Sequence, residues 1–148
     1  MISKFKYIVL MSAVFFTASQ QVQADAHIRS HKQVECLSVM AYHEAKGESK
    51  QGTLAVMHTT LNRVRDSRFP NSVCSVVYQK GQYSWSKHNP KIRDYETFNK
   101  IKSFAYDVVK GKYKDNTAGS LYFNSLHKRP KGTVQTVRID GHSFYRPI

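Results

Sequence analysis

The chain has 148 residues, of which 41% are hydrophobic, and its 23 Lys and Arg against 10 Asp and Glu give a formal net charge of +13. This length fits one domain and excludes a multidomain enzyme, and the apolar content excludes a disordered basic tail. No apolar run reaches the roughly 20 residues of a membrane-spanning helix. The positive charge indicates an anionic partner, and nucleic acid, a membrane surface and a cell-wall polymer with peptide carboxylates all remain open.

The N-terminus has the pattern of a secretory signal peptide over residues 1–24. Lysines precede a short apolar stretch, and small residues stand at the cleavage position, so we expect cleavage after Ala24 and a secreted or periplasmic protein. The alternatives are an amphipathic first helix and a retained membrane anchor. The polar residues 25–33 predict a flexible lead-in, which leaves 34–148 as the folded domain.

Cys36 and Cys74 are the only cysteines of the chain. In an oxidising compartment an even pair predicts a disulfide, and the chain-entropy model assigns a loop of this length roughly 4 kcal/mol of stabilisation. The alternative is a Cys nucleophile, which needs a free thiolate.

The first predicted helix covers VECLSVMAYHEA, residues 34–45. Its apolar stripe at spacings of three and four contains Leu37, Met40 and Ala41, and Glu44 lies on the same stripe. Gly47 is expected to end the helix.

Two further helices follow. Ser49 is a candidate N-cap for a helix with apolar residues every three to four positions, and Pro70 lies in the segment that breaks this pattern. Asn71 is expected to cap a short third helix. Residues 80–93 read as a loop with a short extended piece over 83–85.

The last helix is predicted over Asp94 to Lys110, with Asp94 as its N-cap. Beyond it the apolar period changes from 3.6 to 2, which predicts strands over 121–123 and 134–139 and a hairpin turn at Asp140-Gly141. Helices precede strands without βαβ units, so the fold class is α+β, mostly helical with a small antiparallel sheet or hairpin in the C-terminal half.

Glu44 is the most informative residue because it lies among apolar neighbours. Burial disfavours the charged form and raises the pKa of a carboxyl group, and a carboxylic acid that stays protonated near neutral pH can donate a proton to a leaving glycosidic oxygen. The alternative is a Glu that pairs with Lys or Arg and closes the helix.

Glu48, four residues on, is the candidate second carboxylate of a two-acid glycosidase. A structural role at the start of the next helix is equally compatible with its position. The His43-Glu44 pair lacks a His at position 47, where HExxH requires one, so we expect no metal.

The second half supplies aromatic, amide and hydroxyl side chains of the kind that line carbohydrate clefts. The candidate substrate-binding residues are Tyr83, Ser84, Trp85, Tyr122, Asn124, His142 and Tyr145. Core packing is the alternative for each, and it is favoured for Tyr122 and Tyr145.

Several blocks in order resemble one family: CLSVMAYHEAKGES, QGTLAVMHTTLNRV, FPNSVCSVVYQ, GQYSW, GSLYFN and GHSFYR. Over residues 34–146 the chain is similar to the SleB/CwlJ-type cell-wall hydrolases, the spore cortex-lytic group. The resemblance implies a lysozyme-like fold and a lytic transglycosylase that cuts peptidoglycan between N-acetylmuramic acid and N-acetylglucosamine. Glu44 matches the Glu that opens the family's EARGE block.

The chain departs from the family pattern at several positions. Lys46 replaces the usual Arg, Gly81 replaces a Cys, and Asn124 stands where a His is expected. No Trp follows Pro130 in KGTVQTV. The last two departures concern the sugar subsites and leave the catalytic block intact.

We therefore expect a monomeric peptidoglycan-cleaving enzyme that needs no cofactor and meets the membrane only through its signal segment. The alternatives are a hydrolytic muramidase and a non-catalytic wall-binding module on the same scaffold. A nucleic-acid binder is disfavoured by the export signal.

Overall fold

The computed structural model describes residues 30–148, so the predicted signal peptide and residues 25–29 of the predicted lead-in lie outside the described residues. The elements in chain order are α2 (His31–Ala45), α3 (Lys50–Arg65), α4 (Val73–Val77), the 3₁₀ helix η1 (Trp85–Lys87), α5 (Tyr95–Val109), β1 (Tyr122–Asn124), β2 (Thr133–Ile139) and β3 (His142–Pro147). Helices precede strands, as predicted for an α+β fold.

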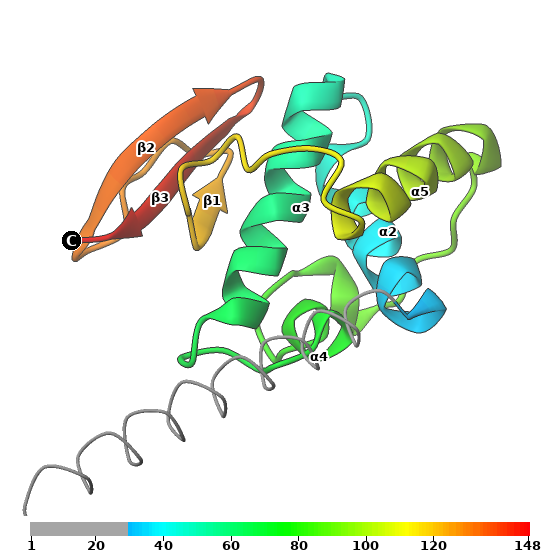
Figure 1. Cartoon of the computed structure of the whole chain (residues 1–148), viewed down its shortest axis with the longest axis horizontal. Coiled ribbons are helices and arrows are strands. Elements are labelled where there is room, and N and C mark those ends of the chain that lie inside the picture. Colours follow the sequence, from blue (N-terminus) through cyan, green and yellow to red (C-terminus); the bar gives the residue numbers. More distant parts are fainter. Residues whose placement is uncertain (1–29) are drawn as a thin grey trace, which may run out of the picture.

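Helix α3 is the centre of the molecule. It stands between the sheet on one side and α2 and α5 on the other (Figure 1). Most residues of α3 are buried, and Met57 and Leu61 belong to the same core cluster as the fully buried Leu37 and Met40 of α2. A helix covered on several sides loses the one-sided apolar pattern, because even its polar positions face protein.

The predicted caps of two helices are confirmed. The Ser49 hydroxyl accepts a hydrogen bond from the Gly52 N–H (3.2 Å) at the start of α3, and the Asp94 carboxylate accepts from the Thr97 N–H (3.0 Å) at the start of α5. Helix α2 ends at Ala45, and Gly47 follows with a φ of +94°, a conformation that glycine adopts without strain.

Three local predictions need correction. Ser72 rather than Asn71 caps α4, because the Ser72 hydroxyl reaches the Ser75 N–H (3.2 Å). The chain at Trp85 is a 3₁₀ turn, not an extended piece. Helix α2 begins at His31, within the predicted lead-in. Gln33 is buried there because its side-chain oxygen accepts from the backbone N–H of Cys74 (3.0 Å), a partner distant in sequence.

The sheet has three antiparallel strands in the order β1-β3-β2. Ile139 pairs with His142 across Asp140-Gly141, so the predicted hairpin is confirmed. A register shift between Gln135 and Val137 marks a β-bulge in β2. The hairpin turn brings His142, the first residue of the central strand, to the end of the sheet near the C-terminus of α2.

Cys36 and Cys74 form the predicted disulfide, which joins α2 to α4 across 38 positions of sequence. Both cysteines of the chain are therefore in this bond, and the Cys nucleophile is excluded.

Replacing both cysteines, as Cys36→Ser/Cys74→Ser, is expected to lower the free energy of unfolding by about 3–4 kcal/mol, because the unfolded chain regains the entropy of an open loop. Urea denaturation measures the loss. Wild-type protein unfolded in reductant serves as the control and should show a similar loss, whereas an unchanged midpoint in both would contradict the prediction.

Candidate active site

Glu44 lies in the last turn of α2 at a cleft of about 460 Å³. Its neighbours toward the N-terminus, Met40 and Ala41, are fully buried, so the helix carries the carboxylate to the edge of the core. The cleft is lined by residues from α2, the loop before η1, β1 with its following loop, and β3: Glu44, Gln82, Tyr83, Ser84, Phe123, Asn124, Ser125, Leu126 and His142.

Burial raises the pKa of the Glu44 carboxyl group, as its place on the apolar stripe predicts. A hydrogen bond from Trp85 Nε1 to Glu44 Oε1 (2.7 Å) opposes this rise, since it favours the carboxylate. The positive charge of Arg63 acts in the same direction, yet the effect of burial is larger. Glu44 can therefore hold a proton at a higher pH than an exposed Glu can.

Trp85 contacts Glu44 but does not line the cleft. Its ring stacks on Tyr83 at 5.6 Å and 14°, and it packs against His43 at 4.6 Å. Because its N–H is committed to Glu44, the indole orients the carboxylate. Tyr83, on which Trp85 stacks, is buried and does line the cleft.

The predicted binding residues divide into two groups. Tyr83, Ser84, Asn124 and His142 line the cleft with Glu44. Trp85, Tyr122 and Tyr145 do not line it.

Strand geometry explains why two of the tyrosines lie elsewhere. Tyr122 faces Phe69 and the guanidinium of Arg63, because successive residues of β1 point to opposite faces and Phe123 takes the cleft side. Tyr145 is fully buried in the central strand, opposite Tyr122. Tyr145 is therefore a core residue, as the packing alternative predicts. Tyr122 is only half-buried.

Sequence reasoning missed four lining residues: Gln82, Phe123, Ser125 and Leu126. Gln82 lies in the block GQYSW and Phe123 in the block GSLYFN, beside predicted binding residues, so their positions in these blocks could have indicated them. Ser125 and Leu126 belong to an irregular loop without periodicity. This loop is held by His127, whose Nδ1 lies 2.9 Å from the Ser143 hydroxyl and whose Nε2 accepts from Arg138 Nη2 (3.0 Å).

Glu48 does not line the cleft and instead ties the α2–α3 corner to the hairpin turn. Its Oε2 accepts from the Gly141 N–H (3.1 Å), and its Oε1 is 3.9 Å from His142 Nδ1. Beside it, Asp140 accepts from both the backbone N–H (2.9 Å) and the hydroxyl (2.6 Å) of Ser49. These contacts favour the structural interpretation of Glu48 and relate it to the cleft only through His142.

Within residues 30–148 no group of three or more His, Cys, Asp or Glu side chains is arranged to hold a metal ion. In the same range no helix is both long and apolar enough to cross a bilayer.

The sequence matches the family model described as Cell Wall Hydrolase over residues 47–145. The chain belongs to the cell wall hydrolase family. The predicted family and enzyme class are thereby confirmed. The matched range begins just after Glu44, so the family match itself does not include this residue.

Two solved structures resemble this cell wall hydrolase over 79% of its chain, each with a TM-score of 0.65. The catalytic domain of the Bacillus cereus SleB protein is 26% identical and is covered over 91% of its length. The catalytic domain of the germination-specific lytic transglycosylase SleB from Bacillus anthracis is 25% identical and is covered over 96%. This likeness confirms the predicted lysozyme-like α+β fold.

A curated relative, the spore cortex-lytic enzyme of Bacillus subtilis (strain 168), is 36% identical over 50 residues. That match covers 34% of this chain and only 16% of the relative.

Trp85→Phe tests the hydrogen bond to Glu44. Phe keeps an aromatic ring on Tyr83 but removes the N–H that favours the carboxylate, so the pKa of Glu44 is expected to rise further. If protonated Glu44 starts the reaction, the alkaline limb of the kcat/KM profile moves to higher pH. Tyr95→Phe, at an exposed ring on α5, is the control and should leave the profile in place.

The role of Glu48 is tested by two substitutions. Glu48→Ala loses the acceptor for Gly141 and is expected to lower the free energy of unfolding by about 1–2 kcal/mol, measured by urea denaturation. Glu48→Gln keeps an acceptor oxygen and should retain most of the activity. Loss of activity in a stably folded Glu48→Gln would instead assign the carboxylate a catalytic role.

Proposed function

We propose that this cell wall hydrolase cleaves peptidoglycan between N-acetylmuramic acid and N-acetylglucosamine, as a lytic transglycosylase with Glu44 as its acid and base. The observation that carries the proposal is a carboxyl group whose pKa is raised by burial and which opens onto a polar cleft. Family membership and the likeness to the SleB catalytic domains support the substrate and the reaction.

The reaction begins with protonated Glu44. The carboxyl group donates its proton to the glycosidic oxygen as the bond to C1 of N-acetylmuramic acid breaks. The resulting carboxylate, held by Trp85, then takes the proton of the 6-hydroxyl of the same sugar, whose oxygen bonds to C1. The product is a 1,6-anhydro ring, no water is consumed, and Glu44 is protonated again.

The number of acids in the cleft supports this mechanism over hydrolysis. A two-carboxylate glycosidase needs a second acid roughly 5–10 Å from the first. Among residues 30–148, Glu44 is the only carboxylate that lines the cleft, and Glu48 is engaged by Gly141 and faces His142. A hydrolytic muramidase remains the alternative that product analysis distinguishes.

We assign substrate contacts to the four predicted residues that line the cleft: Tyr83, Ser84, Asn124 and His142. Asn124 Oδ1 is buried and lacks a hydrogen-bond partner among the described residues. Buried polar atoms of this kind are satisfied when a ligand supplies the missing donor or acceptor. A sugar hydroxyl or N-acetyl group provides both.

The remaining proposals concern the setting of the enzyme. Export through the 1–24 segment, with cleavage after Ala24, would place a monomer outside the cytoplasm. There its positive charge would concentrate it on an anionic wall.

Glu44→Gln is the decisive substitution. The amide keeps the shape and an acceptor for Trp85 but cannot donate the proton, so release of soluble muropeptides from purified peptidoglycan is expected to fall by at least about 100-fold. Mass spectrometry of the wild-type products should show anhydro ends, lighter than hydrolysed ends by one water. Undiminished release by a folded Glu44→Gln would refute the role of Glu44, and hydrolysed ends would establish the muramidase alternative.

A further inference from the structure

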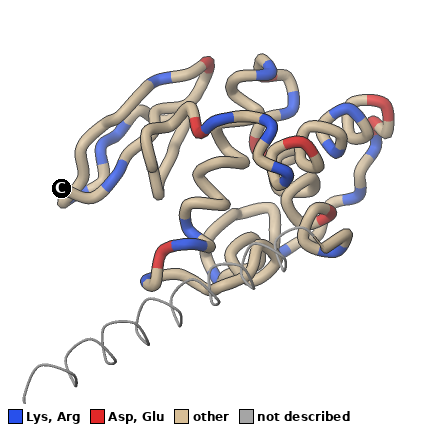
Figure 2. The backbone as a smooth tube through the Cα atoms, in the orientation of Figure 1, with Lys and Arg blue, Asp and Glu red and all other residues tan. Residues whose placement is uncertain are grey.

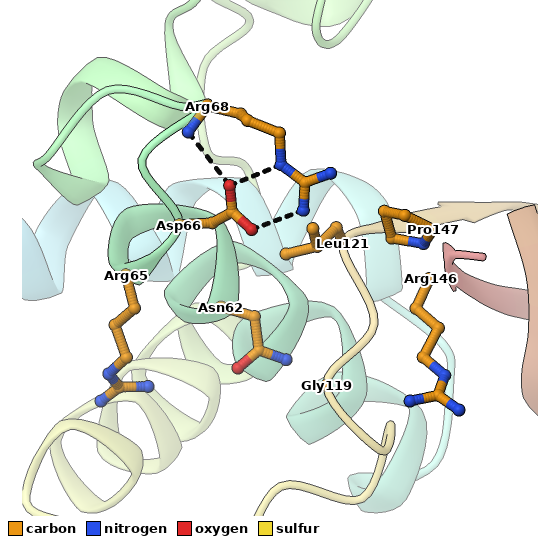
Figure 3. A pocket seen from close by; sticks show the side chains of 8 residues that line it. All are labelled: Asn62, Arg65, Asp66, Arg68, Gly119, Leu121, Arg146 and Pro147. Atoms are coloured by element: carbon orange, nitrogen blue, oxygen red, sulfur yellow. Dashed lines mark hydrogen bonds and ion pairs between the residues drawn. The ribbon is translucent and has the colours of Figure 1, made fainter. Parts of the chain in front are cut away.

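A second hollow, shallow and open to solvent and of about 390 Å³, lies at the C-terminal end of α3, outside the Glu44 cleft. Figure 3 shows its lining, which includes Asn62, Arg65, Asp66, Arg68, Gly119 and Arg146. The arginines come from the end of α3, the turn that follows it and the end of β3. We call this hollow the arginine pocket.

The arginine pocket carries a net positive charge, with three arginines against Asp66 and Asp115. Asp115 touches the lining because its Oδ2 accepts from Asn62 Nδ2 (2.9 Å) and from the Gly119 N–H (3.0 Å). Arg68 and Asp66 neutralise one another through paired hydrogen bonds, from Nε to Oδ1 (2.8 Å) and from Nη2 to Oδ2 (2.6 Å). These bonds lower the pKa of Asp66 to about 2, so the pair stays ionised. Arg65 and Arg146 have no acidic partner among residues 30–148.

The two unpaired guanidinium groups line the same pocket from opposite sides. Arg65 and Arg146 extend in the same direction, with Asn62 and Gly119 between them (Figure 3). Lys and Arg are spread over the whole described backbone. At the turn after α3 they stand on both sides of an acidic residue (Figure 2). Arg65 is the last residue of α3, where the helix dipole favours a positive charge. Arg146 lies in β3, and only the tertiary structure brings it to the arginine pocket.

A ligand for this pocket needs an anionic group that accepts from the guanidinium N–H donors of Arg65 or Arg146. Arginine binds carboxylates and phosphates through two parallel N–H donors. The pocket lining contains no aromatic side chain, which disfavours single-stranded nucleic acid, because that ligand is held largely by stacking.

We propose that the arginine pocket binds the carboxylate groups of peptidoglycan stem peptides. This inference rests on the proposed function, because the stems are attached to the same polymer as the sugars of the cleft. The pocket and the cleft share a buried neighbour in Arg63. Its Nε donates to the carbonyl of Leu121 (2.6 Å) in the pocket wall, and its charge acts on Glu44 and Tyr83 in the cleft. Capture of a stem would raise the local concentration of glycan at the cleft.

The test measures binding in the full chain carrying Glu44→Gln, so that the polymer is not cut. Three ligands are compared: peptidoglycan freed of phosphate polymers, the same material with its carboxylates converted to amides, and glycan stripped of its stems by an amidase. The test variant adds Arg65→Gln/Arg146→Gln. The matched control adds Lys110→Gln/Lys114→Gln, which removes the same charge from exposed positions outside the pocket.

The test variant is expected to bind unmodified peptidoglycan about tenfold more weakly, as the loss of one or two charge-assisted contacts predicts. Its affinity for amidated and stem-free material should equal that of the parent, and the control should change less than about twofold. Arg65→Lys/Arg146→Lys keeps the charge without the paired donors and should recover only part of the affinity.

Equal losses in the test and control variants, or an equal loss on stem-free glycan, would overturn the proposal. A loss confined to a phosphate polymer, measured with polyphosphate as the probe, would overturn the carboxylate assignment. Cleavage of unmodified peptidoglycan by the chain with Glu44 and both arginines intact is measured separately. Absence of that cleavage contradicts the proposed function, while the binding comparison still decides the role of the arginine pocket.

Discussion

The central physical constraint is the burial of one carboxyl group at the end of a helix, with a single strong donor beside it. Desolvation raises the pKa of Glu44, and the N–H of Trp85 limits the rise while fixing the group in place. Such a balance suits the role that we propose for Glu44, in which the group first gives a proton and then takes one back. The stack of Trp85 on Tyr83 makes the donor rigid, so the aromatic pair contributes through orientation.

Glu44 and Glu48, the two acids of the HEAKGE block, face different parts of the molecule because α2 ends between them. Helix α2 stops at Ala45, and Gly47 turns the chain away with a positive φ. Glu44 therefore stays on the helical stripe that faces the cleft, while Glu48 meets the N–H of Gly141 at the hairpin turn. A continuous helix would have placed both on one face.

Positive charge serves two purposes in this molecule. Arg63 is buried, donates to the carbonyl of Leu121 and acts on the Glu44 carboxyl group through its charge. Arg65 and Arg146 remain at the surface without acidic partners in the described part of the chain, where they create the arginine pocket. Net charge alone leaves these roles indistinguishable, because it does not show which charges are neutralised.

Local patterns in the sequence determined the order of the four α-helices, the caps at Ser49 and Asp94, the hairpin turn and the burial of Glu44, because each depends on neighbours within a few positions. The tertiary structure alone decided which aromatic residues reach the cleft. Tyr122 points away from it and Phe123 toward it because of strand register, and Leu126 lines it because of contacts made by His127 with distant residues. Such placements depend on pairings across long sequence separations, which no local period encodes.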